Sequence, residues 1–143
     1  MKLKQSQKGL AMVEAAIILP VFILIMFGIA ELGIVLYDQA VITNASREAA
    51  RSGIVLRTPE LTDAEIQGVA TNYCLGNVIG FRLGETCTVP PPIRTTDANG
   101  DLLSVTVNYN YFSLVIGNLL TLFPGDPFPN PLTLTATTTM YME

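Results

Sequence analysis

A hydrophobic run over residues 10–37, interrupted only by Glu14 and Glu31, limits how this chain can fold. Its uncharged centre, residues 15–30, makes about 24 Å of helix at about 1.5 Å per residue. With the flanking apolar residues the helix reaches about 30 Å, the thickness of the hydrocarbon core of a bilayer. The alternative is a buried helix of a soluble domain, but the rest of the 143-residue chain looks too small to cover it on all sides. We therefore expect the run to cross a membrane.

The charges that flank the run indicate its orientation. The first nine residues hold all three lysines and no acid, and positive flanks stay on the cytoplasmic side of a membrane. A secretory signal peptide would share these features, but no convincing small-x-small cleavage site follows the apolar core. The helical pattern continues instead through residues 38–51, and Gly53 offers a stop. One helix from about Leu10 to about Ser52 is therefore expected, about 65 Å long, half in lipid and half projecting beyond it.

Composition excludes several classes of function. The chain has no histidine, which removes Ser-His-Asp triads, Cys-His pairs and histidine-ligated metal sites. A formal net charge of -4 provides no electrostatic footprint for nucleic acid. A tethered hydrolase is the weakest class considered, because the sequence shows no compact acid pair in a cleft-forming motif. We expect a protein that is not an enzyme and needs no cofactor.

The carboxylate of Glu14 lies inside the expected membrane helix and needs a compensating interaction. A charge costs about 2.5–3.5 kcal/mol at the centre of a bilayer and less near an end. If the chain were cut after Gly9, Leu10 would carry a new ammonium group, and Glu14 would lie in the first turns of the helix, where the helix dipole favours an anion. Glu14 could then pair with the ammonium of a neighbouring subunit. The alternative is an interfacial glutamate that only marks the end of the span.

The N-terminal lysines, Gly9, Leu10 and Glu14, followed by an apolar helix, resemble a type IV prepilin cleavage motif. In that family a membrane aspartyl peptidase cuts after the glycine, and the glutamate five residues later assists assembly. More narrowly, residues 9–33 and 43–53 together resemble the TadE-like pseudopilins of the Tad/Flp pilus system. The matching positions are Gly9, Val13, Glu14, Pro20, Gly28, Glu31, Gly33, Asn44, Arg47 and Arg51.

The resemblance implies a pilin-like α+β fold and a minor pilus component that acts in pilus assembly or adhesion through helix–helix packing. Residues 1–9 would be a cytoplasmic leader that is cleaved, residues 10–53 the membrane-spanning and projecting helix, and residues 54–143 a periplasmic head. The implied partners are inner-membrane lipid, the prepilin peptidase, and other pilin or pseudopilin subunits with their assembly machinery. Incorporation into an extracellular pilus stays open. The alternative is an uncleaved single-pass scaffold of the same secretion apparatus.

Three features of the helix permit two interpretations each. Pro20 predicts a kink or local melting, which either helps a subunit leave the bilayer or only improves packing. Glu31 does not share a helix face with Glu14 and is expected to mark the far membrane boundary, with a partner contact as the alternative. Arg47 and Arg51 form a basic stripe, by default a solvated face, although the resemblance favours docking against the head or a neighbouring subunit.

The first part of the head predicts a short helix and a disulfide. Thr62 and Glu65 form a capping box ahead of an amphipathic helix of about eleven residues, which Gly76 closes. Cys74 and Cys87 are the only cysteines. In an oxidising exterior they suggest a disulfide worth about 3 kcal/mol, with two reduced, buried thiols as the alternative. Two cysteines without histidine do not make a zinc site.

The last part of the head reads as strands. Residues 93–96 and 102–111 are expected to pair as a hairpin around a turn at 97–101, and alternation over residues 132–138 predicts a final strand. A weak calcium candidate in the turn is formed by Asp97, Asn99 and Asp101. The turn lacks the later glycine and glutamate of an EF-hand loop. The expected architecture is a long hydrophobic helix followed by a small antiparallel sheet with one short helix.

Overall fold

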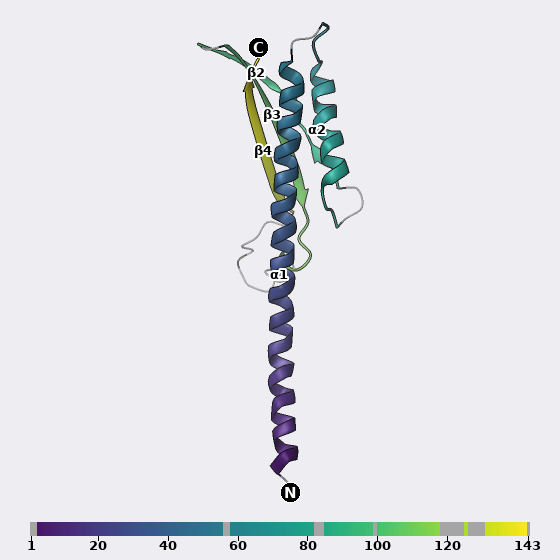
Figure 1. Cartoon of the computed structure of the whole chain (residues 1–143), viewed down its shortest axis with the longest axis vertical. Coiled ribbons are helices and arrows are strands. Elements are labelled where there is room, and N and C mark those ends of the chain that lie inside the picture. The colour runs from purple at the N-terminus through teal and green to yellow at the C-terminus, as the bar shows by residue number, and fades with distance from the viewer. Residues whose placement is uncertain are drawn as a thin grey trace.

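The computed structural model describes residues 3–55, 58–81, 85–98, 100–117, 125 and 131–142, without the side chains of residues 3–9. A single long helix carries a small sheet and a second helix at its C-terminal half (Figure 1). The predicted α+β architecture is thereby confirmed. The elements are α1 (Leu3–Ile54), α2 (Asp63–Asn77), β1 (Cys87–Thr88), β2 (Ile93–Asp97), β3 (Gly100–Tyr111) and β4 (Leu132–Tyr141).

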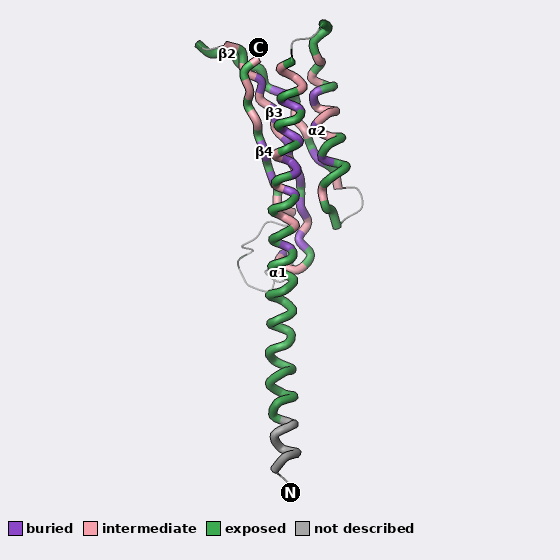
Figure 2. Tube along the Cα trace, viewed as in Figure 1, coloured by how far each residue is buried: buried purple, intermediate pink, exposed green. Residues whose placement is uncertain are grey.

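Helix α1 forms both the projecting rod and one layer of the head. Its 52 residues correspond to about 78 Å, longer than expected because it begins at Leu3 and ends at Ile54. It runs through Pro20 without interruption, so no melted segment divides it. Figure 2 shows that residues 10–27 of the helix are exposed, whereas its C-terminal half has a buried face against the sheet and α2.

The sheet is built around β3, which has partners on both sides. β4 pairs with β3 antiparallel along its length, from Leu102 opposite Tyr141 to Tyr111 opposite Leu132. On the other side, β2 pairs with the beginning of β3 and the two-residue β1 pairs near its end. The predicted hairpin is confirmed as β2–β3, and Gly100 enters β3 with a φ of 139°, a conformation that favours glycine. The short β1 was not predicted.

The alternation along β3 separates a core face from a polar face. Its apolar and aromatic side chains point toward α1 and are buried: Leu103, Val105, Val107, Tyr109 and Tyr111. On the opposite face, hydroxyl and amide side chains of β3 and β4 pair across the strands, as in Thr106–Thr137 at 2.9 Å and Thr135–Asn108 at 2.9 Å. One face of the sheet therefore packs on the helix and the other meets solvent.

Helix α2 begins with the predicted capping box. The Thr62 hydroxyl accepts a hydrogen bond from the Glu65 amide at 3.3 Å, and the Glu65 carboxylate accepts one from the Thr62 amide at 2.8 Å. The expectation that Gly76 closes this helix is wrong, because α2 includes Gly76 and ends at Asn77. The buried residues Ile66, Ala70 and Cys74 pack the helix against the core, and the amide of the C-cap residue Val78 donates a hydrogen bond to the Cys74 carbonyl.

Gly53 is required by packing rather than as a helix stop. A Cβ atom at this position would lie 2.5 Å from Cδ2 of Leu103 and 2.8 Å from Cδ1 of Ile66. Both neighbours are fully buried and have little room to give way. The missing side chain therefore lets β3 and α2 approach the last turn of α1.

Candidate functional site

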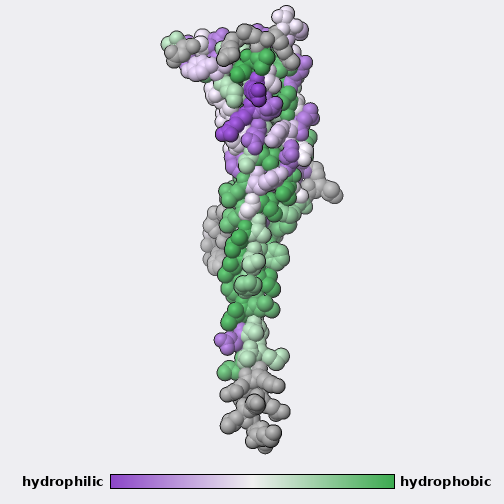
Figure 3. Space-filling view, in the orientation of Figure 1, coloured by the Kyte–Doolittle hydropathy of each residue, from purple (hydrophilic) through white to green (hydrophobic). Residues whose placement is uncertain are grey.

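Among the described residues, a long apolar surface lies on α1 over residues 10–27. Every residue from Leu10 to Phe27 is exposed, and large side chains such as Ile17 and Phe22 expose 67% and 57% of their area. Figure 3 shows this surface as a nearly continuous hydrophobic column below a more polar head. Within the described residues, α1 is the one helix long and apolar enough to cross a membrane. An exposed apolar surface of this extent is typical of a contact site for a membrane or for another protein.

The residues of the expected cleavage motif lie at the beginning of this column. Gly9 and Leu10 both belong to α1, so the peptide bond between them is helical. Glu14 is exposed and lies beside Ala11, Ala15 and Ile18. The small neighbours leave the Glu14 carboxylate accessible to a group that approaches from another chain. Its role in assembly remains a prediction.

Glu31 fastens the loop that follows β3 to α1. Its side chain is buried, with 5% of the residue exposed. Its Oε1 atom accepts a hydrogen bond from the Leu114 amide at 2.6 Å, and its Oε2 atom accepts hydrogen bonds from the amides of Val115 at 3.2 Å and Ile116 at 2.9 Å. The interpretation of Glu31 as a boundary marker alone was therefore incomplete, since its carboxylate satisfies three backbone donors of the head.

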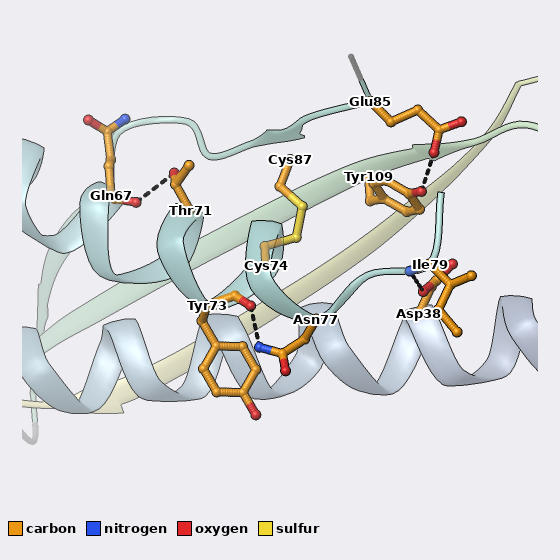
Figure 4. The surroundings of a disulfide bond; sticks show 10 residues. All are labelled: Asp38, Gln67, Thr71, Tyr73, Cys74, Asn77, Ile79, Glu85, Cys87 and Tyr109. Carbon is orange, nitrogen blue, oxygen red and sulfur yellow. Dashed lines mark hydrogen bonds between the residues drawn. A yellow bond between two sulfur atoms is a disulfide. The ribbon is translucent and has the colours of Figure 1, made fainter. Parts of the chain in front are cut away.

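The side chain of Asp38 likewise binds a backbone amide of the loop that follows α2. It is fully buried, and its Oδ1 atom accepts a hydrogen bond from the Ile79 amide at 2.8 Å (Figure 4). Its Oδ2 atom has no hydrogen-bond partner among the described residues. Burial, together with the nearby Glu85 carboxylate, raises the pKa of Asp38, although the Ile79 hydrogen bond acts in the opposite direction.

The sequence contained a signal for this pair that the sequence analysis missed. Asp38 follows Glu31 by seven residues, which is about 20° short of two helical turns, so both acids share one face of α1. Glu31 was compared only with Glu14. The spacing of seven residues by itself predicts that Glu31 and Asp38 lie on the same helix face.

Two tyrosines of β3 lie between the fastened loops. The Tyr109 hydroxyl donates a hydrogen bond to Glu85 at 2.5 Å, and burial and this bond raise the pKa of Tyr109 (Figure 4). Burial and the nearby carboxylates of Glu31 and Asp38 raise the pKa of Tyr111 to about 12. The Tyr111 ring meets Phe81 edge-to-face with centroids 6.2 Å apart. The end of β3 thus joins the two loops beside α1.

Asp38 makes the stability of the head depend on pH. Because its pKa is raised in the folded chain, folding takes up a proton, and stability is lost as the pH rises from the unfolded value of 3.8 through the folded pKa. Asp38→Asn keeps an acceptor for the Ile79 amide and removes the buried charge. We expect this variant to be more stable than the wild type at pH 7 by about 1 kcal/mol, with the difference shrinking in acid. Urea unfolding at several pH values measures this; an advantage that grows toward low pH contradicts it.

The structure contains the disulfide expected between Cys74 and Cys87, with Cα atoms 6.2 Å apart. It links the last turn of α2 to β1, and both cysteines are buried (Figure 4). The bridge closes the segment that carries Ile79 and Glu85. Through it, the loop after α2 is held at both of its ends.

The remaining predicted site residues lie on α1 and in the turn between β2 and β3. Asn44, Arg47 and Arg51 lie on an exposed face of α1, as a solvated stripe does, and docking there is untested. In the turn between β2 and β3, Asp101 accepts a hydrogen bond from Thr96 at 2.5 Å, and Asp97 accepts one from Tyr141 at 3.4 Å. Asn99 lies outside the described residues. Within the described part of the chain, no group of three histidine, cysteine or acidic side chains is placed to hold a metal ion.

Comparison with known proteins finds a family model that matches the N-terminal helix. The family model described as TadE-like protein matches residues 9–51. No curated protein and no solved structure matches the chain. The match begins at the glycine of the cleavage motif, covers the apolar column and both fastening acids, and ends just before the head separates from α1. Over these residues the N-terminal helix of this chain is therefore similar to that of TadE-like proteins.

Proposed function

We propose that the chain is a minor pseudopilin of a Tad/Flp-type pilus or secretion system, acting in assembly or adhesion through helix–helix packing. Residues 10–30 cross the inner membrane, with the N-terminal lysines in the cytoplasm and the head in the periplasm. A prepilin peptidase removes residues 1–9, and the apolar column then packs against the helices of other pilus subunits. The head, residues 54–143 with the C-terminal half of α1, meets its partners outside the membrane.

One observation carries this proposal: the apolar column is exposed on every side. A helix that belonged to a soluble core would have neighbours along its length, but residues 10–27 are exposed in the folded chain. A column of this kind needs lipid before assembly and other apolar helices after it. The glycines at positions 28 and 33 would let another helix approach this surface closely, because small residues at a helix interface allow the backbones to come near each other.

A second candidate function is an uncleaved single-pass scaffold of the same apparatus, and the helical Gly9–Leu10 bond supports it. A peptidase that reads an extended chain must first unwind this part of α1, which begins at Leu3. An uncleaved chain needs no such step. The two candidate functions therefore differ in whether the Gly9–Leu10 peptide bond is cleaved.

Intact-mass analysis of the protein from its native membrane distinguishes the two. Cleavage predicts a chain that begins at Leu10, whereas the scaffold predicts a chain that keeps residues 2–9 beside an active peptidase. A Gly9→Val variant is the control, because a branched side chain should block a site that accepts glycine. If the wild type and this variant both keep the leader, cleavage is contradicted and the scaffold stands.

The charge of Glu14 is expected to matter for assembly and not for folding. Glu14→Gln keeps the shape of the exposed side chain but cannot pair with an ammonium group in lipid. We expect at least about a tenfold loss of incorporation into sheared pili, equivalent to about 1.4 kcal/mol, with an unchanged amount in the membrane. Quantitative immunoblots of both fractions measure this.

Glu48→Gln is the matched control for this experiment. Glu48 is an exposed acid on the same helix but lies beside the head, outside the apolar column. Its replacement should leave incorporation unchanged. Equal incorporation of Glu14→Gln and the wild type would remove the proposed role of the Glu14 charge.

A further inference from the structure

The end of the head that faces the apolar column is itself apolar. Two loops meet there, residues 78–81 after α2 and residues 112–117 after β3 (Figure 1). Three of their large side chains are exposed: Ile79 by 42%, Phe81 by 41% and Leu114 by 51%. We name Ile79, Phe81 and Leu114 the apolar collar.

The collar is continuous with the hydrophobic surface of α1. Phe81 and Leu114 line a shallow hollow of about 230 Å³ together with Phe27, Ala30 and Ile34 of the helix. Phe27 is also the last residue of the fully exposed column. Glu31 also lines this hollow, but its carboxylate is buried against the loop amides, so the exposed surface that runs from the helix onto the lower end of the head is apolar here.

The length of α1 sets the level of the collar. Glu31, which binds the amide of Leu114, lies 21 residues after Leu10. This separation corresponds to about 32 Å of helix, against about 30 Å for the hydrocarbon core of a bilayer. A span that begins at Leu10 thus brings Leu114 to the far membrane surface, whereas Ile79, whose amide binds Asp38 seven residues further along α1, lies about 10 Å beyond it.

Backbone groups beside the collar are already satisfied. The amides of residues 114–116 donate to Glu31, and the Ile79 amide donates to Asp38. An unpaired amide that enters an apolar medium costs several kcal/mol. The two buried acids remove this cost for four donors beside the collar, so the exposed side chains next to these amides can gain apolar surroundings at a lower cost.

We propose that the apolar collar inserts into the lipid surface where α1 leaves the bilayer, so that the head rests on the membrane before assembly. This inference rests on the proposed membrane span of α1. The ligand is the acyl and headgroup boundary of the bilayer rather than a protein. Apolar and aromatic side chains on a surface next to a membrane span are suited to this boundary.

The chain has no tryptophan, so single tryptophans can report the surroundings of chosen positions. The full-length chain is placed in vesicles of phosphatidylethanolamine and phosphatidylglycerol that contain lipids brominated on their acyl chains. Phe81→Trp and Leu114→Trp report the collar. Phe22→Trp reports the span, and Tyr141→Trp, at the end of β4 with 49% of Tyr141 exposed, is the matched control in the head.

We expect the brominated lipids to quench both collar tryptophans several-fold more than Tyr141→Trp, with emission shifted to shorter wavelengths. If Phe22→Trp is quenched but the collar tryptophans behave like Tyr141→Trp, the proposed insertion of the collar is wrong and the proposed membrane span is retained. If Phe22→Trp is not quenched, both the proposed membrane span and the proposed insertion of the collar are wrong. A shifted but unquenched collar signal would show that protein covers the collar, which also overturns a lipid contact. Using two collar positions keeps the test decisive if one variant misfolds.

Discussion

Replacing Glu31 with alanine is expected to lower the free energy of unfolding of the head by about 3–5 kcal/mol. The carboxylate accepts hydrogen bonds from three successive amides, those of residues 114–116, and is itself buried. Its removal leaves three donors without an acceptor in a partly buried loop, each costing about 1–3 kcal/mol unless water reaches it. Urea unfolding of the full-length chain in detergent, followed by tyrosine circular dichroism, measures the loss.

Hydrogen exchange provides the local test of this expectation. The amides of residues 114–116 should exchange faster in Glu31→Ala, whereas those of β3 change less. Glu48→Ala is the matched control, because it removes an exposed acid from the same helix and should change stability by no more than about 0.5 kcal/mol. Equal stability and equal protection in Glu31→Ala and Glu48→Ala would contradict the fastening role of Glu31.

Removing the disulfide is the second change with a large expected effect. The double variant Cys74→Ala/Cys87→Ala opens a loop that spans a sequence separation of 13 residues, for which chain entropy predicts a loss of about 3 kcal/mol. The loop after α2 then keeps the Ile79–Asp38 hydrogen bond near its start and the Tyr109–Glu85 hydrogen bond near its end. The shift of the urea midpoint at constant slope measures the loss.

Reduction of the wild-type protein is the control for this variant. Dithiothreitol breaks the same bond without changing the side chains that fill the core, so the reduced wild type and the double variant should unfold at similar urea concentrations. If reduction leaves the midpoint unchanged while the thiols are shown to be free, the bridge does not stabilise the head.

The same helix serves the membrane span and the core of the head, which bears on how a subunit assembles. The residues of α1 that pack under the sheet include Ile42, Ala45 and Ala49, all fully buried. α1 continues without a break from this core into the apolar column. The head therefore follows the orientation of the column unless α1 bends, and Pro20 is the position where a bend is least costly.

Patterns that involve near neighbours in the chain were enough to predict much of this architecture. The apolar run predicted α1, the Thr62–Glu65 pair predicted the beginning of α2, and alternation along residues 102–111 predicted β3 and its buried face. Each of these follows from helix or strand periodicity or from a cap, and each depends on residues only a few positions apart. The family resemblance rested on the same local stretch of α1.

Contacts between distant parts of the chain became visible only in the packed molecule. Glu31 binds an amide 83 positions away and Asp38 one 41 positions away, while Gly53 is needed because Leu103 and Ile66 converge on it. A periodic pattern shows which face of a helix is buried but not which backbone donor will reach that face. Tertiary packing assigns those partners, because the free energy of a buried carboxylate depends on the groups that surround it rather than on its neighbours in sequence.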